Sequence, residues 1–458
     1  MTSHNVHENI LGCVGGTPLV RLNSISKEIR TQVWAKCEFM NPGSSVKDRI
    51  GAAIIDDAVA QGNLKPGGTV VEATSGNTGV GLALAATIKG FQCIFTIPDK
   101  MSMEKVKLLK AFGAKVIVTP TVDPDHPEYY VTVAKNIVKS TPNSVLANQF
   151  YNQVNPETHY KTTGPELWEQ VDGKIDALVA GLGTGGTLSG MGKFLKEKNP
   201  NIRIVGADPL GSVYKSFKET GKLIKGNVYK VEGIGQDKIP ETSWMDCIDE
   251  FREVSDKDSF NLARRLTREE ALFVGGSAGT ALAIALQIAE ELDDPEKRVV
   301  VVLPDTGERY LSKCHSDEWM RENQFLEEPA RSVQHLLLSK TDSTHSPVVS
   351  VDSAATVKAA LTAMNTANVS QVPVIDNGES VGSLDEAHLM GLVLEKGAAL
   401  DTLVGEVMEA PFPVVSADEN LDYVSRLLGR GNSALLVRDD AELTGILTRY
   451  DIIHSMAG

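Results

Sequence analysis

Short apolar segments alternate with amphipathic segments and glycine-rich joints along the first two thirds of the chain. Between about residues 10 and 325, most apolar segments have the length of a strand and are followed within a few residues by Gly, Ser, Thr or Pro. This alternation is typical of parallel sheets covered by helices on both faces, and it predicts a doubly wound α/β fold with mostly parallel sheets. Ligands of such folds bind at the carboxyl ends of the strands, where these joints lie. The clearest predicted strands are Thr69–Glu72, Cys93–Ile97, Lys115–Val118, Ala177–Ala180, Arg203–Ala207 and Arg298–Leu303.

A polar stretch over residues 326–345 separates this α/β part from a C-terminal region. It mixes Pro, Ser, Thr and charged residues without a sustained period, so we predict a linker that contains one short helix. The region over 346–458 contains an internal repeat, because PVVSVDS at Pro347 recurs as PVVSADE at Pro413. Each copy continues with a helical pattern, a strand and a glycine-led segment. We therefore expect an α/β domain over 1–325, the linker, and a tandem α+β module over 346–458.

Composition and charge exclude several functional classes. The chain is 42% hydrophobic and 23% charged, which is ordinary for globular proteins. Its 458 residues are too many for one hydrophobic core, so we expect more than one domain. A formal net charge of -15 would repel a phosphate backbone, so we expect no nucleic acid partner. We also expect no membrane association and a cytoplasmic location, because no apolar run approaches the roughly 18 residues of a span and no signal sequence is present. The five cysteines are widely spaced and the histidines are scattered, so we expect neither disulfides nor a metal site.

The first chemical motif is GLGTGG, which follows a predicted strand and opens a helical pattern. Its glycines and the helix start would present backbone N–H groups to a phosphate, and Thr184 and Thr187 add hydroxyl donors. A dinucleotide site is one interpretation, with Asp208 as the acidic residue that such sites need. A tight turn without a ligand is another, although five glycines in ten residues weigh against it.

Two further motifs resemble those of unrelated enzymes. GGSAG around Ser277 matches the hydrolase nucleophile elbow, but no His and Asp partners can be singled out downstream. Ser277 is better interpreted as a hydrogen-bonding group at the start of the helix Thr280–Leu292. SSVKDR matches the S-x-x-K of penicillin-recognising enzymes, but their companion motifs are absent. Lys47 in this motif follows a Pro-Gly turn at the start of a helix, where desolvation would lower its pKa toward Schiff-base chemistry, although a solvated surface lysine is the ordinary alternative.

Together these motifs resemble a known family. PGSSVKDR with Lys47, TSGNTG, GTGGT and GGSAGT occur in the order found in the fold-type II pyridoxal-phosphate enzymes of the cysteine synthase and cystathionine β-synthase family. The resemblance covers residues 10–325 and implies a catalytic domain that uses pyridoxal 5′-phosphate. It also implies a homodimer or higher homo-oligomer.

The resemblance also implies individual roles. Lys47 would be the internal-aldimine lysine, Asn77 would bond the cofactor's 3′-oxygen, and Ser277 would meet its pyridine nitrogen. Because a hydroxyl does not hold a proton on that nitrogen as a carboxylate would, elimination and replacement at Cβ are favoured over transamination. The residues implied for the cofactor phosphate are Gly183, Thr184, Gly185, Gly186 and Thr187. Those implied for the substrate carboxylate are Thr74, Ser75, Gly76, Thr78 and Gln149.

Within the family, several segments look more like cystathionine β-synthases, which join L-serine and L-homocysteine through an aminoacrylate, than like cysteine synthases. These segments are KCEFMNPG, MSMEKVKLLKAFGA, DPLGSV and EGIGQD. Gln236 departs from the pattern, since animal and yeast enzymes commonly have tyrosine there, and DTGERYLS leans toward cysteine synthases. A cysteine synthase using O-acetylserine or serine with sulfide is thus the main alternative. We expect no haem, because the catalytic pattern begins by Ile10 without the haem-binding extension of vertebrate enzymes.

The C-terminal repeat resembles a tandem pair of CBS domains, which commonly bind adenosyl ligands. In the second copy, Thr448 and Asp451 form a T-x-x-D that would contact ribose and phosphate. Ser383 and Glu386 are expected in the corresponding places of the first copy. The ligand could be S-adenosylmethionine, ATP or AMP, or the pair could serve only in dimer contacts. A non-catalytic adenosyl-nucleotide sensor is disfavoured because Lys47 and the phosphate loop are intact.

Overall fold

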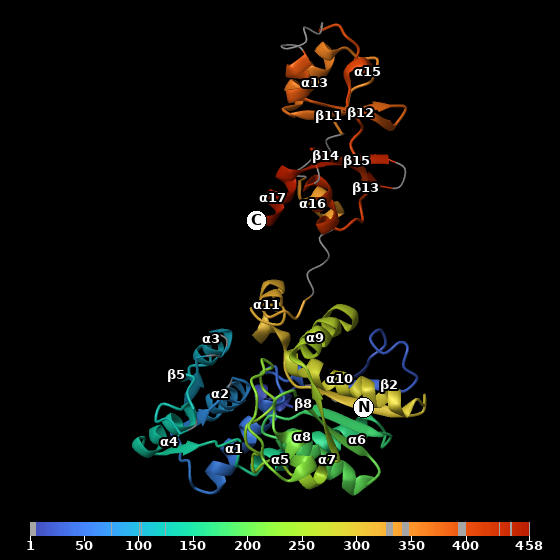
Figure 1. The fold of residues 1–458 in the computed structure, drawn as a ribbon. Helices are drawn as coiled ribbons and strands as arrows, with labels where there is room; N and C mark the ends of the chain where they lie inside the picture. Colours follow the sequence, from blue (N-terminus) through green and yellow to red (C-terminus); the bar gives the residue numbers. More distant parts are fainter. Residues whose placement is uncertain are drawn as a thin grey trace. The chain divides into compact units, whose positions relative to one another are not determined.

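The computed structural model describes residues 6–74, 76–99, 101, 103–123, 125–326, 333–340, 348–392, 400–429, 431–439 and 442–457. The chain divides into two compact units, Met1–Leu326 and Glu327–Gly458 (Figure 1). The first unit contains two sheets with their helices, and the second contains two smaller sheets that each carry short helices.

The larger sheet of the first unit has the strand order β1-β2-β10-β7-β8-β9. Its neighbouring strands run parallel except for β1, which is antiparallel to β2. In β10, Val299, Val301 and Leu303 face one hydrophobic cluster, and Val300 and Val302 face another, as the two-residue period of a strand requires. The strands are β1 Leu19–Arg21, β2 Gln32–Cys37, β7 Ala177–Gly181, β8 Arg203–Pro209, β9 Glu250–Val254 and β10 Arg298–Leu303.

Helices cover both faces of this sheet. Residues of α9 and α10 pack in the cluster on one face, and residues of α6 and α7 pack in the cluster on the other. Burial on both faces explains why the central strands consist almost entirely of aliphatic residues. These helices are α6 Thr163–Gln170, α7 Gly186–Lys198, α9 Asp256–Glu270 and α10 Gly276–Leu292.

The smaller sheet is wholly parallel, in the order β5-β4-β3-β6. Helices α1 and α2 pack on one face and α4 packs on the other. The strands are β3 Thr69–Ala73, β4 Gln92–Pro98, β5 Lys115–Thr119 and β6 Ser144–Leu146. The remaining α-helices of the first unit are α1 Lys47–Ala60, α2 Asn77–Lys89, α3 Met103–Ala111, α4 Tyr130–Ser140, α5 Val154–Lys161, α8 Tyr214–Thr220 and α11 Asp317–Glu322.

The doubly wound, mostly parallel α/β fold is therefore confirmed. All six strands expected from the sequence are present, as β3, β4, β5, β7, β8 and β10. Sequence reasoning missed β1, β2, β6 and β9, which are short or carry charged residues.

The second unit repeats one α+β arrangement. Each copy contains an antiparallel hairpin preceded by a helix and followed by another, and both hairpins have a register shift at the same place. The first copy contains α13 Val357–Ala367, β11 Gln371–Asp376, β12 Glu379–Asp385, α14 Glu386–Met390 and α15 Val404–Val407. The second contains β13 Val414–Ser416, α16 Leu421–Gly429, β14 Ala434–Asp439, β15 Glu442–Thr448 and α17 Arg449–Ala457.

The hairpin register corrects one prediction about this repeat. Gln371 pairs with Asp385 in the first hairpin, and Ala434 pairs with Thr448 at the equivalent place in the second. Asp385 and His388, rather than Ser383 and Glu386, therefore correspond to Thr448 and Asp451. The prediction was wrong because it aligned the copies by residue type, whereas the bulged hairpin sets their register.

A helix does occur within the predicted linker, as α12 Val333–Lys340. Val333 and Leu336 belong to the hydrophobic core of the second copy, and Val333 N donates to Glu419 O over 3.0 Å. This helix is thus part of the second unit. The flanking stretches 327–332 and 341–347, including the expected boundary at residue 346, lie outside the described residues.

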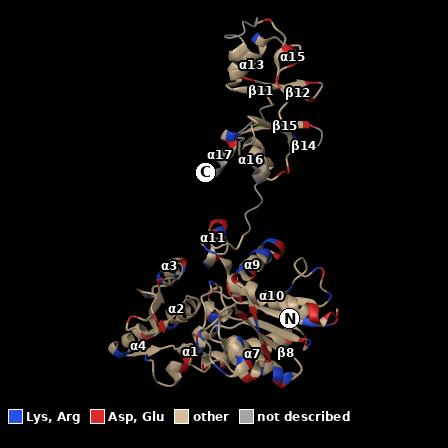
Figure 2. Cartoon of the chain, in the orientation of Figure 1, with Lys and Arg blue, Asp and Glu red and all other residues tan. Residues whose placement is uncertain are grey.

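Charges of both signs are distributed over the surface. Figure 2 shows Lys and Arg interspersed with Asp and Glu, for example along α9. Among the helices the structure describes, none is long and apolar enough to cross a membrane.

Candidate active site

A cavity in the first unit lies at the carboxyl ends of β7 and β10, where the starts of α1, α2, α7 and α10 converge. Such a convergence places several helix N-termini, with their unpaired N–H groups, around one space. The residues that line the cavity are Val46, Lys47, Asn77, Ala180, Gly181, Gly183, Thr184, Gly185, Thr187, Gly233, Ile234, Ser277, Val302, Pro304 and Asp305.

Lys47 is the first residue of α1 and projects from a loop fixed to the end of β10. Val46 N donates to Pro304 O over 2.8 Å, and Lys47 N donates to Ser45 Oγ over 3.2 Å. Ser44, which precedes this pair, has a left-handed backbone with φ of 60°. A non-glycine residue in that conformation is costly and needs strong support from its surroundings. The loop that presents Lys47 is therefore held in a defined conformation.

Close packing of α1 against α2 brings Lys47 near Asn77. A Cβ atom on Gly51 would lie 2.3 Å from the carbonyl of Gly81, and one on Gly81 would lie 2.5 Å from Lys47 O. These glycines are needed because the two helix backbones approach too closely for side chains. Both helices begin at the cavity as a result.

Loss of hydration lowers the pKa of the Lys47 ammonium below its ordinary value. The carboxylates of Asp305 and Glu38 partly oppose this shift. A lowered pKa increases the fraction of neutral amine, which is the form that attacks carbonyl groups and takes up protons.

The loop between β7 and α7 forms the opposite wall. Gly185 has φ of 81°, and a Cβ there would lie 2.0 Å from Ser243 Oγ. Thr184 is held from behind, because Asn155 Nδ2 donates to its Oγ1 over 2.9 Å. The first N–H groups of α7 have no partner within the helix, so the loop can bind an anion. Gly186 begins α7 but does not line the cavity.

A buried histidine lies behind this loop. His159 Nε2 is 3.2 Å from Thr187 Oγ1, and His159 Nδ1 is 2.8 Å from Thr163 Oγ1. Burial lowers the pKa of His159 well below its ordinary value, with the positive charges of Arg49 and Lys47 acting in the same direction. The ring is therefore neutral at physiological pH and orients the Thr187 hydroxyl without adding charge.

Ser277 lies in the first turn of α10, which begins at Gly276 rather than at the expected Thr280. Its side chain is buried and lines the cavity. The residues around it belong to a buried, aliphatic helix, which is not the exposed elbow of a hydrolase.

Asn77, at the start of α2, lies between a carboxylate and a guanidinium. Its Nδ2 donates to Asp305 Oδ2 over 2.7 Å, and its Oδ1 accepts from Arg309 Nη1. Tyr310 also donates to Asp305 Oδ2, over 2.5 Å. Sequence analysis assigned no role to Asp305, Arg309 or Tyr310, although all three lie in the DTGERYLS segment.

The residues expected at the substrate carboxylate form a second group. Thr74 Oγ1 accepts from Gly76 N over 3.0 Å, and Thr78 Oγ1 donates to Gln149 Oε1 over 2.6 Å. Ser75, which belongs to the same predicted set, lies outside the described residues. None of the described members of this group lines the cavity of Lys47.

The buried carboxyl of Glu72 supports the loop that carries Gln149. Glu72 accepts from Asn148 N over 2.6 Å and from Gln149 N over 3.3 Å. Burial raises the pKa of Glu72 to about 8, although both backbone hydrogen bonds favour its ionised form. The loop that carries Gln149 is thus fixed to the strand that leads into Thr74.

Asp208, the acidic residue of the dinucleotide interpretation, is buried at the end of β8. Its Oδ2 accepts from Lys215 N over 3.3 Å, at the start of α8. It does not line the cavity, so it does not serve the glycine loop as a ribose-binding residue would.

The two copies in the second unit differ at the equivalent helix starts. Asp451 Oδ2 accepts from Thr448 N over 2.7 Å and from Thr448 Oγ1 over 2.8 Å. In the first copy, Asp385 Oδ1 accepts from His388 N, and His388 occupies the position of Asp451. Only the second copy places a carboxylate there.

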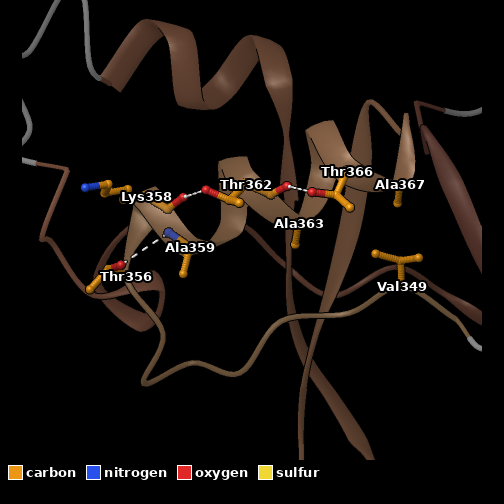
Figure 3. A pocket seen from close by; sticks show the side chains of 8 residues that line it. All are labelled: Val349, Thr356, Lys358, Ala359, Thr362, Ala363, Thr366 and Ala367. Atoms are coloured by element: carbon orange, nitrogen blue, oxygen red, sulfur yellow. Dashed lines mark hydrogen bonds between the residues drawn. The ribbon is translucent and has the colours of Figure 1, made fainter.

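A hollow also lies on the surface of α13 in the first copy (Figure 3). Its threonine hydroxyls are engaged within the helix, since Thr362 donates to Lys358 O and Thr366 donates to Thr362 O. The lining residues are Val349, Thr356, Lys358, Ala359, Thr362, Ala363, Thr366 and Ala367. In the part of the chain that is described, no group of three or more His, Cys, Asp or Glu side chains could hold a metal ion.

Comparison with known proteins relates both units to families. The family described as "Pyridoxal-phosphate dependent enzyme" matches residues 10–305, and "CBS domain" matches residues 342–395 and 404–458. The cystathionine beta-synthase of Apis mellifera is 40% identical, over 97% of this chain and 90% of that protein. That of Saccharomyces cerevisiae is 36% identical, over 98% of each chain.

Solved structures match the first unit. The O-acetylserine dependent cystathionine beta-synthase from Helicobacter pylori is 35% identical with a TM-score of 0.62, and covers 67% of this chain and 98% of its own. A hydrogen sulfide-producing enzyme from Fusobacterium nucleatum is 32% identical with the same TM-score, and covers 67% of this chain and 100% of its own. The chain therefore belongs to the family of pyridoxal-phosphate-dependent enzymes, in the branch of the cystathionine β-synthases, and carries a pair of CBS domains.

Proposed function

We propose that the protein joins L-serine and L-homocysteine to form cystathionine. In this β-replacement the Cβ–O bond of serine breaks, a Cβ–S bond forms with the thiol, and water is released. The observation that carries the proposal is the single cavity that combines Lys47, Asn77, Ser277 and the glycine loop. Relatives named cystathionine beta-synthase, similar over nearly the whole chain, support it.

The residues present fit pyridoxal phosphate. Lys47 would hold the cofactor, Ser277 would face its ring nitrogen, and Asn77 would bond its ring oxygen. The start of α7 with Thr184 and Thr187 would bind its phosphate, which fits the helix N-terminus and the tightly backed loop. When bound, the cofactor supplies an electron-withdrawing ring that stabilises negative charge at the amino acid's α-carbon.

The chain's own groups would act around that centre. The Lys47 amine would take the proton from Cα and later return it, which its lowered pKa favours. Thr74, Gly76, Thr78 and Gln149, with Ser75, would bind and orient the substrate carboxylate. Their hydrogen-bonded arrangement supports this role.

A second candidate is a cysteine synthase that uses O-acetylserine or serine with sulfide. The names of the Helicobacter pylori and Fusobacterium nucleatum proteins point to other donors or products within the same fold. Gln236 is the position where this chain departs from the animal and yeast pattern. It is half-buried and fixed by its backbone, since Gln236 N donates to Ser212 Oγ over 3.1 Å.

Steady-state kinetics with both donors and both thiols separates these candidates. Serine and O-acetylserine are each combined with homocysteine and with sulfide, and kcat/KM is measured for all four pairs. We expect serine with homocysteine to exceed each other pair by about tenfold or more, or about 1.4 kcal/mol of transition-state preference. A preference for O-acetylserine with sulfide would make the enzyme a cysteine synthase.

For the second unit we propose an adenosyl ligand, with the ribose at Thr448 and Asp451. The carboxylate of Asp451 is suited to accept from sugar hydroxyls. We further propose a homodimer or higher homo-oligomer in the cytoplasm. Its five free cysteines fit a reducing compartment.

A further inference from the structure

Asn77 is the residue on which the inference centres. An asparagine amide can turn about its last torsion and exchange its oxygen with its nitrogen, and the two ends differ in hydrogen bonding. A residue that must donate to a cofactor oxygen therefore needs its amide fixed in one orientation. The proposed function requires Asn77 to donate through Nδ2.

We propose that Asp305 and Arg309 are positioning residues that fix the Asn77 amide, so that one N–H of Nδ2 remains available to the cofactor's ring oxygen. This inference rests on the proposed function of the cavity and adds residues to it. It does not depend on which amino acid or thiol the enzyme uses.

The charges around Asn77 distinguish the two ends of its amide. The carboxylate of Asp305 accepts from Nδ2 over 2.7 Å, and the guanidinium of Arg309 donates to Oδ1. The opposite orientation would place the NH₂ group against the guanidinium and the oxygen against the carboxylate. Both contacts would then be repulsive, so one orientation is strongly favoured.

Hydrogen-bond capacity leaves one donor for the cofactor. An asparagine NH₂ group has two N–H bonds, and Asp305 accepts one of them. Asn77 is half-buried and lines the cavity. Asp305 also lines the cavity but is only 1% exposed, and Arg309 is 5% exposed. The fixed side of the amide thus lies in the protein, and the cavity lies beside it.

Asp305 itself is fixed by the other cofactor-binding segments. It forms an antiparallel bridge with Ser45 in the Lys47 loop, and Gly275 N donates to Asp305 O over 3.2 Å just before Ser277. Tyr310 donates to Oδ2 of Asp305, the same oxygen that accepts from Asn77. Arg309 in turn donates to Gly43 O, in the turn that leads to Lys47. Asp305 therefore connects the segments that carry Lys47, Asn77 and Ser277.

A double-mutant cycle on the full-length enzyme tests the proposal. The variants are Asp305→Ala, Asn77→Ala and the combination of both, with Asp305→Asn as the isosteric variant. Each is stripped of cofactor and titrated with pyridoxal phosphate. The readouts are the dissociation constant and the ratio of the two absorption bands of the bound cofactor, which reports the proton at its ring oxygen.

We expect Asp305→Ala to weaken cofactor binding about tenfold and to shift the band ratio in the direction of Asn77→Ala. In the Asn77→Ala background, Asp305→Ala should shift the band ratio no further, because its effect on the cofactor's ring oxygen acts through Asn77. A remaining change in affinity would report the Asp305 charge near Lys47. Asp305→Asn keeps an acceptor for Nδ2 and should recover most of the affinity.

Asp208→Ala is the matched control. Asp208 is also a buried carboxylate at the end of a parallel strand, but it does not line the cavity. Its loss should lower the melting temperature and leave the band ratio unchanged.

Additive effects of Asp305→Ala and Asn77→Ala on the band ratio, or an unchanged band ratio in Asp305→Ala, would overturn the proposal and leave Asp305 a structural residue. Failure of the wild-type chain to bind pyridoxal phosphate would instead contradict the proposed function. The two failures are thus distinguishable.

Discussion

The proposed ligand sites of the two units are built in different ways. In the first unit, buried partners such as Asn155 and Ser243 fix the glycine loop from behind, and four helix starts converge on the cavity. In the second unit, the site rests on one carboxylate, Asp451, which already accepts two hydrogen bonds from Thr448. The first site should therefore be sensitive to packing, and the second to one side chain.

The largest expected effect tests the packing of the first site. In Gly185→Ala, the new Cβ would lie 2.0 Å from Ser243 Oγ at φ of 81°, so the loop must move. We expect cofactor affinity to fall by about a hundredfold, or about 2.7 kcal/mol. Titration of the cofactor-free enzyme with pyridoxal phosphate measures this change.

Gly221→Ala is the control for backbone strain alone. Gly221 ends α8 with φ of 69° and open space around it, so alanine there adds about 1–2 kcal/mol of left-handed strain without a clash. It should lower thermal stability and leave cofactor affinity unchanged. Equal affinities in the two variants would show that the packing behind the loop is unimportant.

A smaller effect is expected at the second site. Asp451→Asn removes the charge that would accept from ribose hydroxyls, and we expect adenosyl-ligand affinity to fall about tenfold. His388→Asn, at the equivalent place in the first copy, should leave affinity unchanged. Calorimetric titration with S-adenosylmethionine, ATP and AMP measures both. An equal loss in both variants would contradict the difference between the copies.

The smallest effect concerns the pH dependence of the first unit. The pKa of Glu72 is raised to about 8, so between pH 5 and 8 the folded chain keeps a proton that the unfolded chain releases. Its folded state is therefore favoured below the unfolded pKa and loses stability as pH rises toward 8. We expect the wild type to lose about 1 kcal/mol more than Glu72→Gln between pH 7 and pH 8. The free energy of unfolding of the first unit, obtained from its urea transition at each pH, measures this loss.

The exposed Glu219 provides the control for this comparison. Glu219→Gln should keep the wild-type pH dependence, because it leaves the buried carboxyl of Glu72 in place. If Glu72→Gln also kept it, the proton would reside elsewhere.

Local motifs explain what the sequence predicted well. Lys47, Ser277 and the loop before α7 depend on glycines and helix starts that are adjacent in the chain, so their pattern is visible in the sequence. Partners from distant segments were not visible in this way. Asn155 and His159 support the glycine loop from α5. Asp305 contacts Asn77 although 228 residues separate them in the sequence.

Buried charge explains a missed strand. β2 contains Lys36, which is fully buried and donates to Thr17 O over 2.7 Å and to Gln170 Oε1 over 2.8 Å. Its charge is paired with Glu166. A lysine in a short segment predicts exposure unless its partners are known. Here Thr17 is 19 residues away in the sequence, and Glu166 and Gln170 are 130 and 134 residues away.

Helix α12 determines where CBS modules can be exchanged between enzymes of this kind. Val333 and Leu336 complete the core of the second copy, although they precede the first repeat in the sequence. If a chimera joined the catalytic domain of one enzyme to the CBS module of another at residue 345, Val333 and Leu336 would come with the catalytic domain. The transferred module would then lack these two side chains of its own core, and a cavity would open there. A junction before Val333 would transfer the module together with its own core, so both domains of such a chimera should fold.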